Sequence, residues 1–245
     1  MKRLFGASLA FIGLSIGAAS AADMPVKAGA LPVAVSNWTG FYIGGNGGGD
    51  WSNDSYRYNF SSPLGGGTPE VFNFNTSSWI AGLQAGYQYQ SGNWVVGVEG
   101  AWSWTNLNQT DPSGLFASIN GPSQRSLKIN DIATVSGRIG YAWGNVLWYG
   151  KVGYAGANMQ GSSDDLVGIT SRASTWQNGI TAGTGIDYKL SSNIILGVEF
   201  DYYHFGSTDM STGTTPPGFT VTYTSPQANI AAVVGRVSYL FNAGY

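Results

Sequence analysis

Apolar and polar residues alternate with a period of two from Trp79 to Trp104, and this pattern limits the possible folds most strongly. Such alternation is typical of a β-strand whose two faces meet different surroundings. Ser91-Gly92-Asn93 interrupts the stretch with a turn sequence. We therefore predict a hairpin in which Tyr89 pairs with Trp94 and Trp79 with Trp104. Each strand runs from one aromatic residue to another over about 10 residues, enough for a tilted strand to cross a membrane.

The same alternation recurs at residues 133–154, 180–202 and 231–241, and residues 40–50 supply a first strand. The connections at 91–93, 144–145 and 191–193 are short. Four others are long, polar and rich in Gly, Ser, Thr, Asn and Pro, at residues 51–73, 106–127, 157–174 and 206–226. Eight strands with short and long connections in turn predict an all-β fold, an eight-stranded antiparallel transmembrane β-barrel with short periplasmic turns and long extracellular loops.

The N-terminus carries an export pattern. Lys2-Arg3 precedes an apolar run from Leu4 to Ala18, and Ala19-Ser20-Ala21 fits a cleavage site. We predict a signal peptide over residues 1–21 that is removed after Ala21, a periplasmic linker over 22–37 and the barrel over 38–245. Charged residues make up only 10% of the chain, against about 25% in an average soluble domain. Such a composition suits a surface that does not face water alone.

Charged residues fall on the strand faces opposite the apolar stripe, which points them into the barrel. Because buried charges are tolerated only when paired, we predict a polar network of ion pairs in the lumen. The neighbouring-strand candidates are Glu99–Arg138, Lys151–Asp187 and Glu199–Arg236. Alternatives are charges solvated by water in the lumen, and a gated ion path. The predicted network comprises Glu99, Arg138, Lys151, Asp187, Glu199, Asp201 and Arg236.

Aromatic residues gather at the strand ends, as in the girdles where membrane proteins meet the headgroups. A sugar-binding platform is the alternative reading of the tryptophans. In the first strand we expect Phe41 and Ile43 to face lipid, with Tyr42 and Gly44 inside. The predicted girdle comprises Trp38, Trp79, Tyr87, Tyr89, Trp94, Trp102, Trp104, Trp143, Trp148, Tyr188, Tyr239 and Phe241.

Few residues are suited to catalysis or metal binding. The chain has no cysteine and one histidine, His204, which we interpret as an interfacial aromatic residue rather than a haem or metal ligand. A G-x-S-x-G match at residues 13–17 lies in the predicted signal peptide, and the glycines of residues 37–49 do not satisfy G-x-G-x-x-G. A net charge of −2 does not favour nucleic-acid binding. We predict no catalytic residues, no metal site, no cofactor and no enzymatic activity.

Two segments carry a family resemblance, Trp38-Thr39-Gly40-Phe41-Tyr42-Ile43-Gly44-Gly45 and Gly235-Arg236-Val237-Ser238-Tyr239-Leu240-Phe241. With the export signal, they resemble the small outer-membrane β-barrel (porin-like, surface-antigen) family of Gram-negative bacteria. The resemblance implies an eight-stranded barrel in outer-membrane lipid and lipopolysaccharide. It also implies recognition of the C-terminal strand by the barrel-assembly machinery. Either Phe241 or Tyr245 could be the terminal aromatic residue of that signal.

Three functions are open to such a chain. We expect a structural and surface-interaction barrel with a role in envelope integrity, whose lumen is largely filled by side chains and whose long loops contact an extracellular ligand or host surface. One alternative is a narrow porin for small solutes. The other is a soluble periplasmic binding barrel of the lipocalin type, although lipocalins place apolar residues inside. Charged residues on the inner face and aromatic residues on the outer one favour the first two.

Overall fold

The computed structural model describes residues 37–61, 70–111, 124–164, 170–206, 209–215, 219–224 and 228–241, with side chains in 37–52, 76–108, 128–160, 174–206 and 228–241. The predicted signal peptide and Tyr245 lie outside these residues. Among the described residues, no helix is long and apolar enough to cross a membrane.

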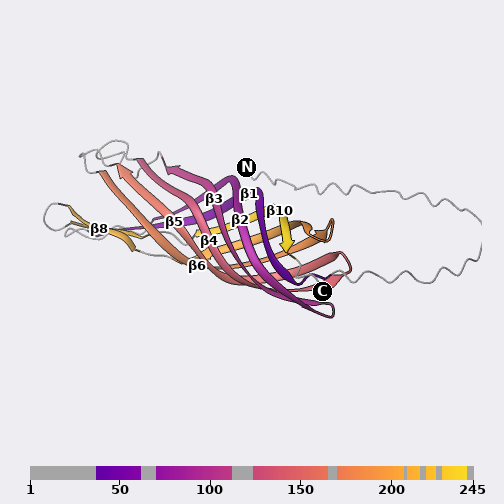
Figure 1. Ribbon diagram of the computed structural model, residues 1–245. Helices are drawn as coiled ribbons and strands as arrows, with labels where there is room; N and C mark the ends of the chain where they lie inside the picture. Colours follow the sequence, from indigo (N-terminus) through magenta and orange to yellow (C-terminus); the bar gives the residue numbers. More distant parts are fainter. Residues whose placement is uncertain are drawn as a thin grey trace, which may run out of the picture. The chain divides into compact units, whose positions relative to one another are not determined.

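Antiparallel strands form one closed sheet (Figure 1). The strands are β1 (Gly40–Ser61), β2 (Glu70–Ser91), β3 (Trp94–Asp111), β4 (Gln124–Trp143), β5 (Val146–Asp164), β6 (Thr170–Lys189), β7 (Ile194–Phe205), β8 (Asp209–Thr215), β9 (Phe219–Thr224) and β10 (Ala228–Phe241). Each of β1 to β6 pairs with the next strand in the chain, β7 pairs with β10, and β10 pairs with β1. These eight strands close the ring, which confirms the predicted barrel. Closure leaves no unpaired edge in hydrocarbon, where each unsatisfied backbone group costs several kcal/mol.

The register of the β2–β3 hairpin differs from the prediction by two residues. Ser91 pairs with Trp94, Tyr89 with Val96 and Ala81 with Trp104. The cause is a two-residue turn in which Gly92 has a φ of 60°, a conformation that glycine adopts without strain. Because the shift is even, each residue keeps its expected face.

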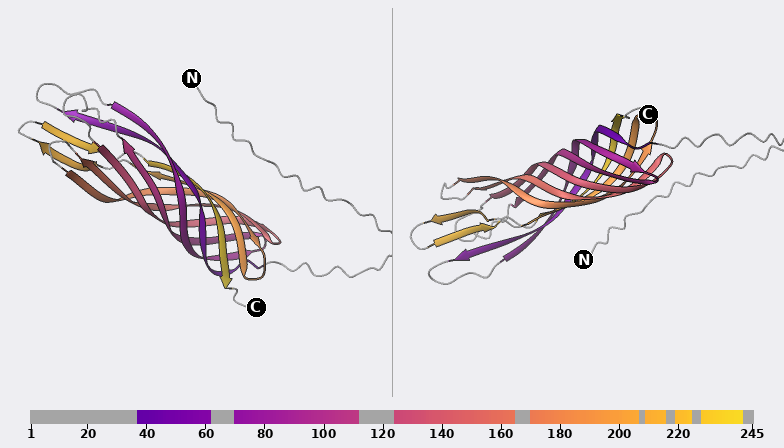
Figure 2. Two further views of the ribbon diagram at one scale, coloured as in Figure 1. Left: turned by 90° about the horizontal axis from the view of Figure 1, so that it is seen from above. Right: turned by 60° about the horizontal axis from the view of Figure 1, so that its bottom comes forward.

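The predicted long loops are also wrong in extent, because strands continue into all four. β1 and β2 pair as far as Tyr58 and Glu70, and β4 and β5 as far as Gln124 and Asp164. The fourth segment contains β8 and β9, and β9 pairs with the outer end of β1. Figure 2 shows this hairpin at the barrel end opposite the C-terminus. Polar composition marks where the apolar outer face stops, whereas backbone hydrogen bonds extend the strands regardless of side-chain polarity.

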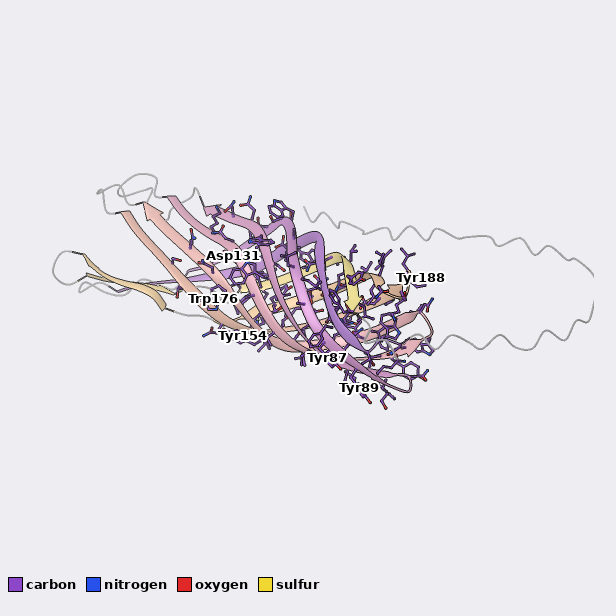
Figure 3. All side chains as sticks on the ribbon, in the orientation of Figure 1. Tyr87, Tyr89, Asp131, Tyr154, Trp176 and Tyr188 are labelled. Carbon is purple, nitrogen blue, oxygen red and sulfur yellow. The ribbon has the colours of Figure 1, made fainter. Side chains whose placement is uncertain are left out.

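The two faces of the wall have opposite composition. Phe41 and Ile43 are 66% and 54% exposed on the outer face, while Tyr42 is buried, as predicted. Eleven of the twelve predicted girdle residues are exposed on the outer face: Trp79, Tyr87, Tyr89, Trp94, Trp102, Trp104, Trp143, Trp148, Tyr188, Tyr239 and Phe241. Figure 3 shows Tyr89 and Tyr188 near the turn end of the barrel and Tyr154 and Trp176 farther along the wall.

Trp38 contradicts its assignment to the girdle, because its side chain is completely buried. It precedes the first paired residue of β1, so strand alternation does not fix its direction. Its indole Nε1 donates a hydrogen bond to the carbonyl oxygen of Gly144 at 3.2 Å. Its backbone N–H donates to Oε1 of Gln90 at 2.7 Å, and the Lys189 ammonium lies 5.3 Å from its ring. Trp38 therefore fills the turn end of the lumen and contacts residues at three turns.

Candidate functional site

The lumen has three layers, which follow the same order along β3, β4, β5, β7 and β10. The turn-end layer is largely apolar and contains Trp38, Tyr42, Val95, Ala142, Leu147, Tyr149, Ile195 and Leu240. The buried Lys189 also enters this layer beside Trp38. The loop-end layer is largely apolar too, and β2 contributes Ile80 to it; its other apolar members are Leu107, Ile129, Ile132, Ala155, Ala157, Met159, Tyr203, Phe205, Ala228, Ile230, Ala232 and Val234. Four buried polar residues lie at the same level, Asp50, Thr105, Gln177 and Thr181, and Thr105 donates a hydrogen bond to Oδ2 of Asp50 at 2.6 Å. Along β4, for example, Ala142 lies in the first layer and Ile132 in the second, with Arg138 between them. We call this middle level the charged layer.

The charged layer contains all seven residues of the predicted lumen network, each between 3% and 8% exposed: Glu99, Arg138, Lys151, Asp187, Glu199, Asp201 and Arg236. They come from six strands, β3, β4, β5, β6, β7 and β10. Strand alternation turns each of them inward while its sequence neighbours face lipid. Three cations and four carboxylates are thus enclosed together.

Arg138 and Lys151 join carboxylates from several strands. Nη2 of Arg138 lies 2.8 Å from Oδ2 of Asp187, and its Nη1 lies 3.5 Å from Oε2 of Glu99. Nζ of Lys151 lies 2.8 Å from Oε1 of Glu199, 2.9 Å from Oδ1 of Asp201 and 3.7 Å from Oε1 of Glu99.

Arg236 completes the layer by pairing with both Glu99 and Glu199. The expected pairs Glu99–Arg138 and Glu199–Arg236 are therefore present. The expected pair Lys151–Asp187 is wrong, since Asp187 binds Arg138. Lys151 lies opposite Gly183 in the sheet and Asp187 opposite Leu147, so adjacent strands do not bring the two charges to the same level.

Two tyrosines of the turn-end layer extend their hydroxyl groups into the charged layer, and neither was predicted to join the network. The Tyr42 hydroxyl donates to Oε2 of Glu99 at 2.8 Å and accepts from Nη1 of Arg138 at 3.1 Å. The Tyr149 hydroxyl donates to Oε2 of Glu199 at 2.6 Å and accepts from Arg236 at 3.0 Å. The Arg138 guanidinium also lies 3.8 Å from the Tyr149 ring centroid, a cation–π contact. Both tyrosines occupy inward-facing positions in the period-two alternation of their strands, as the charged residues do. This pattern could have identified them from the sequence.

The charges of this layer are stabilised by mutual pairing. Buried ions keep their charge only where partners replace the lost water, and each cation here contacts two or more carboxylates. Removing one partner of a buried pair typically costs about 3–5 kcal/mol. Among the described residues, no group of three or more His, Asp or Glu is arranged to hold a metal ion.

A closed ring of strands with an apolar outside and charges inside defines an integral β-barrel of the cell outer membrane, surrounded by outer-membrane lipid. The family model described as "Outer membrane protein beta-barrel domain" matches residues 9–224. The chain belongs to this family.

Comparisons with known proteins agree with this assignment. The "22 kDa outer membrane protein" of Rhizobium leguminosarum bv. viciae is 30% identical over 192 residues, covering 77% of this chain and 72% of the relative. The "25 kDa outer-membrane immunogenic protein" of Brucella ovis is 28% identical over 145 residues, covering 57% of this chain and 62% of the relative. The crystal structure of OprG from Pseudomonas aeruginosa aligns with a TM-score of 0.51 at 15% identity, covering 84% of this chain and 97% of that one, and supports the fold alone.

Proposed function

We propose that this protein is a closed structural and surface-interaction barrel, rather than a diffusion channel. The observation that carries the proposal is the order of the layers in the lumen. A hydrated path along the barrel axis would have to cross two largely apolar layers as well as the charged one. Water and ions cross such constrictions poorly, because few polar groups replace their hydration and the buried Asp50 is already bonded to Thr105.

The charged layer acts in this proposal as an internal brace. Its ion pairs join β3, β4, β5, β6, β7 and β10 across the lumen, so that moving one strand disturbs contacts on several others. A barrel fixed in this way resists deformation in the envelope. This role supports envelope integrity without requiring a ligand in the lumen.

The loop end serves surface contact. β1 and β2 continue well past the exposed Trp51 and Trp79, and β8 and β9 add further strands at this end. The Brucella ovis relative is named as an immunogenic outer-membrane protein. By analogy, we infer that the loop end of this chain is accessible at the cell surface and contacts an extracellular ligand or host surface. At the other end, we propose that the C-terminal strand carries the signal for the barrel-assembly machinery, with Phe241 or Tyr245 as its terminal aromatic residue.

A narrow porin is the second candidate, because ionisable residues inside a barrel could guide small ions. Planar-bilayer recording of the purified, folded protein separates the two functions. We expect no discrete current steps above those of a protein-free control, while a general porin inserted under the same conditions conducts. Reproducible steps from the folded barrel, absent after its removal, would establish the porin and overturn the closed-barrel proposal.

A further inference from the structure

The outer face of the barrel carries charge at one place only among the residues whose side chains the structure describes. There, every Asp, Glu, Lys and Arg is buried except Lys128, which is exposed, and Asp131, which is half-buried. Both belong to the loop-end half of β4. A charge on a lipid-facing wall is unfavourable unless it lies near the membrane surface. Their shared position therefore indicates that this part of β4 lies near the membrane surface.

The same part of β4 contains an irregularity of the ring. The β4–β5 register shifts between Ile129 and Asp131, and the β3–β4 register shifts between Trp104 and Leu107. Asn130 is the extra residue of the β4–β5 bulge, whereas in the β3–β4 pairing the extra residue lies on β3. As a result, two polar residues, Asn130 and Asp131, interrupt the alternation between the buried Ile129 and Ile132. Bulges often redirect side chains next to functional sites.

Two tryptophans converge beside the bulge. The Trp102 and Trp176 rings come from β3 and β6, yet their centroids are 6.1 Å apart with planes inclined by 32°. Small residues of β4 and β5, Ala133 and Gly156, lie opposite each other between them. A methyl group at Gly156 would stand 2.6 Å from Cε2 of Trp176, so the indole lies directly on this glycine.

Neutral polar residues surround the charges and the indoles. Lys128 pairs in the sheet with Asn108 on one side and Gln160 on the other, and Gln160 pairs with Ser174. All four side chains are exposed. Nearer the tryptophans, the Tyr154 hydroxyl donates to Oδ1 of Asn178 at 2.5 Å. Ser174 donates to Oδ1 of Asn158 at 3.2 Å. Figure 3 shows Asp131, Tyr154 and Trp176 in the same region of the wall.

We propose that this surface, the outer β4 patch, binds the phosphorylated sugar headgroup of an outer-leaflet glycolipid. Lys128 supplies a positive charge for a phosphate group. The Trp102–Trp176 pair supplies an apolar surface for a sugar ring and the first carbons of the acyl chains, as interfacial aromatic residues do. The Asp131 carboxylate accepts hydrogen bonds from sugar hydroxyls, and the amides of Asn108 and Gln160 both accept and donate them.

The position of the outer β4 patch in the membrane indicates that its ligand is a lipid. It adjoins exposed tryptophans at the loop end of the barrel, the level at which headgroups meet hydrocarbon in the outer leaflet. A membrane lipid is held there by its chains, whereas a free phosphate has only Lys128. The inference deepens the proposed surface role and rests on the outer-membrane position of the barrel, but not on a closed lumen.

Binding of purified lipid A to the full folded protein in detergent tests the proposal by titration calorimetry. We expect Lys128→Gln to weaken binding of phosphorylated lipid A about tenfold, the usual effect of one charge-assisted hydrogen bond. Dephosphorylated lipid A should bind both forms equally. Inorganic phosphate as a competitor should not displace the lipid, and displacement at millimolar concentration would assign the site to free phosphate instead.

Gly156→Ala tests the indole pair, because the added methyl group displaces Trp176. It should weaken binding of both lipid forms, whereas Trp143→Phe, in the exposed girdle at the turn end, should leave affinity unchanged. Heat-modifiable gel mobility confirms that each variant is folded. If Lys128→Gln and Gly156→Ala bind both lipids as the unsubstituted protein does, the outer β4 patch is no lipid site. A conducting barrel that still loses lipid binding on Lys128→Gln would contradict the closed lumen and leave this inference standing.

Discussion

The inner and outer faces of the barrel wall are made by adjacent residues with opposite chemistry. On β4, Arg138 is buried among carboxylates while Ile139 is 55% exposed on the outer face. On β5, Lys151 and Val152 show the same contrast. In a water-soluble domain the charged member of each pair would face solvent. Here hydrocarbon surrounds the protein, so charge is stable only inside, where other side chains replace water.

The largest effect is expected from removing a buried charge on the inner face. Arg236→Met removes the cation that contacts both Glu99 and Glu199, and leaves two buried carboxylates with fewer partners. We expect the free energy of unfolding to fall by about 3–5 kcal/mol. Urea unfolding in lipid vesicles measures it. Arg236→Lys keeps the charge and should lose less. A loss below about 1 kcal/mol for the methionine variant would mean that the charged layer does not brace the barrel.

The second prediction contrasts a buried tryptophan with an exposed one. Trp38→Ala empties space at the turn end of the lumen and removes the hydrogen bond to Gly144. The expected loss of unfolding free energy is about 3–5 kcal/mol, as for other buried aromatic residues. Trp143→Ala, at a side chain 56% exposed on the outer face, should cost clearly less in the same vesicles. Equal losses of unfolding free energy in the two variants would indicate that Trp38 is an exposed girdle residue.

The third prediction places a charge on the outer face. Val98 lies midway between Trp94 and Trp102 on β3 and is 61% exposed. Val98→Arg should lower the free energy of unfolding in vesicles by about 2–4 kcal/mol, because it exposes a cation to hydrocarbon. Val98→Leu is the matched control and should have little effect. If the arginine variant is as stable as the leucine variant, this face does not lie in the membrane core.

The smallest expected effect concerns the turn that sets the β2–β3 register. Gly92→Ala forces alanine into a φ of 60° and should cost about 1–2 kcal/mol in the same unfolding measurement. Gly137 on β4 also has open space around it, but its φ lies outside the left-handed range. Gly137→Ala should therefore not destabilise the barrel. Equal stability of the two variants would argue against the two-residue turn.

Alternation in the sequence was sufficient to predict the eight strands of the ring and the direction of their side chains. A period of two records which face a residue occupies, and this is why Glu99 and Arg236 were correctly expected inside. It does not record how far a strand extends, since the backbone ladder continues where the side chains become polar. Nor does it extend to Trp38, which precedes the first paired residue.

The partners within the charged layer were harder to predict, because long side chains cross the lumen. Arg138 on β4 reaches Asp187 on β6, and Lys151 on β5 reaches Glu199 on β7, each passing over one strand. Neighbouring-strand logic misses such contacts. The outer β4 patch was harder still, because a bulge breaks the alternation that the prediction relied on.

A single introduced cysteine shows whether the charged layer is sealed from water. The natural sequence has no cysteine, and Ser136 is a buried inward-facing residue paired in the sheet with Glu99. In folded Ser136→Cys, a charged water-soluble thiol reagent should leave the cysteine unmodified until the barrel is unfolded. Asn145→Cys, in the exposed turn between β4 and β5, should react at once. Modification of folded Ser136→Cys at a rate close to that of Asn145→Cys would show that the lumen is hydrated and that the charged layer is open to water.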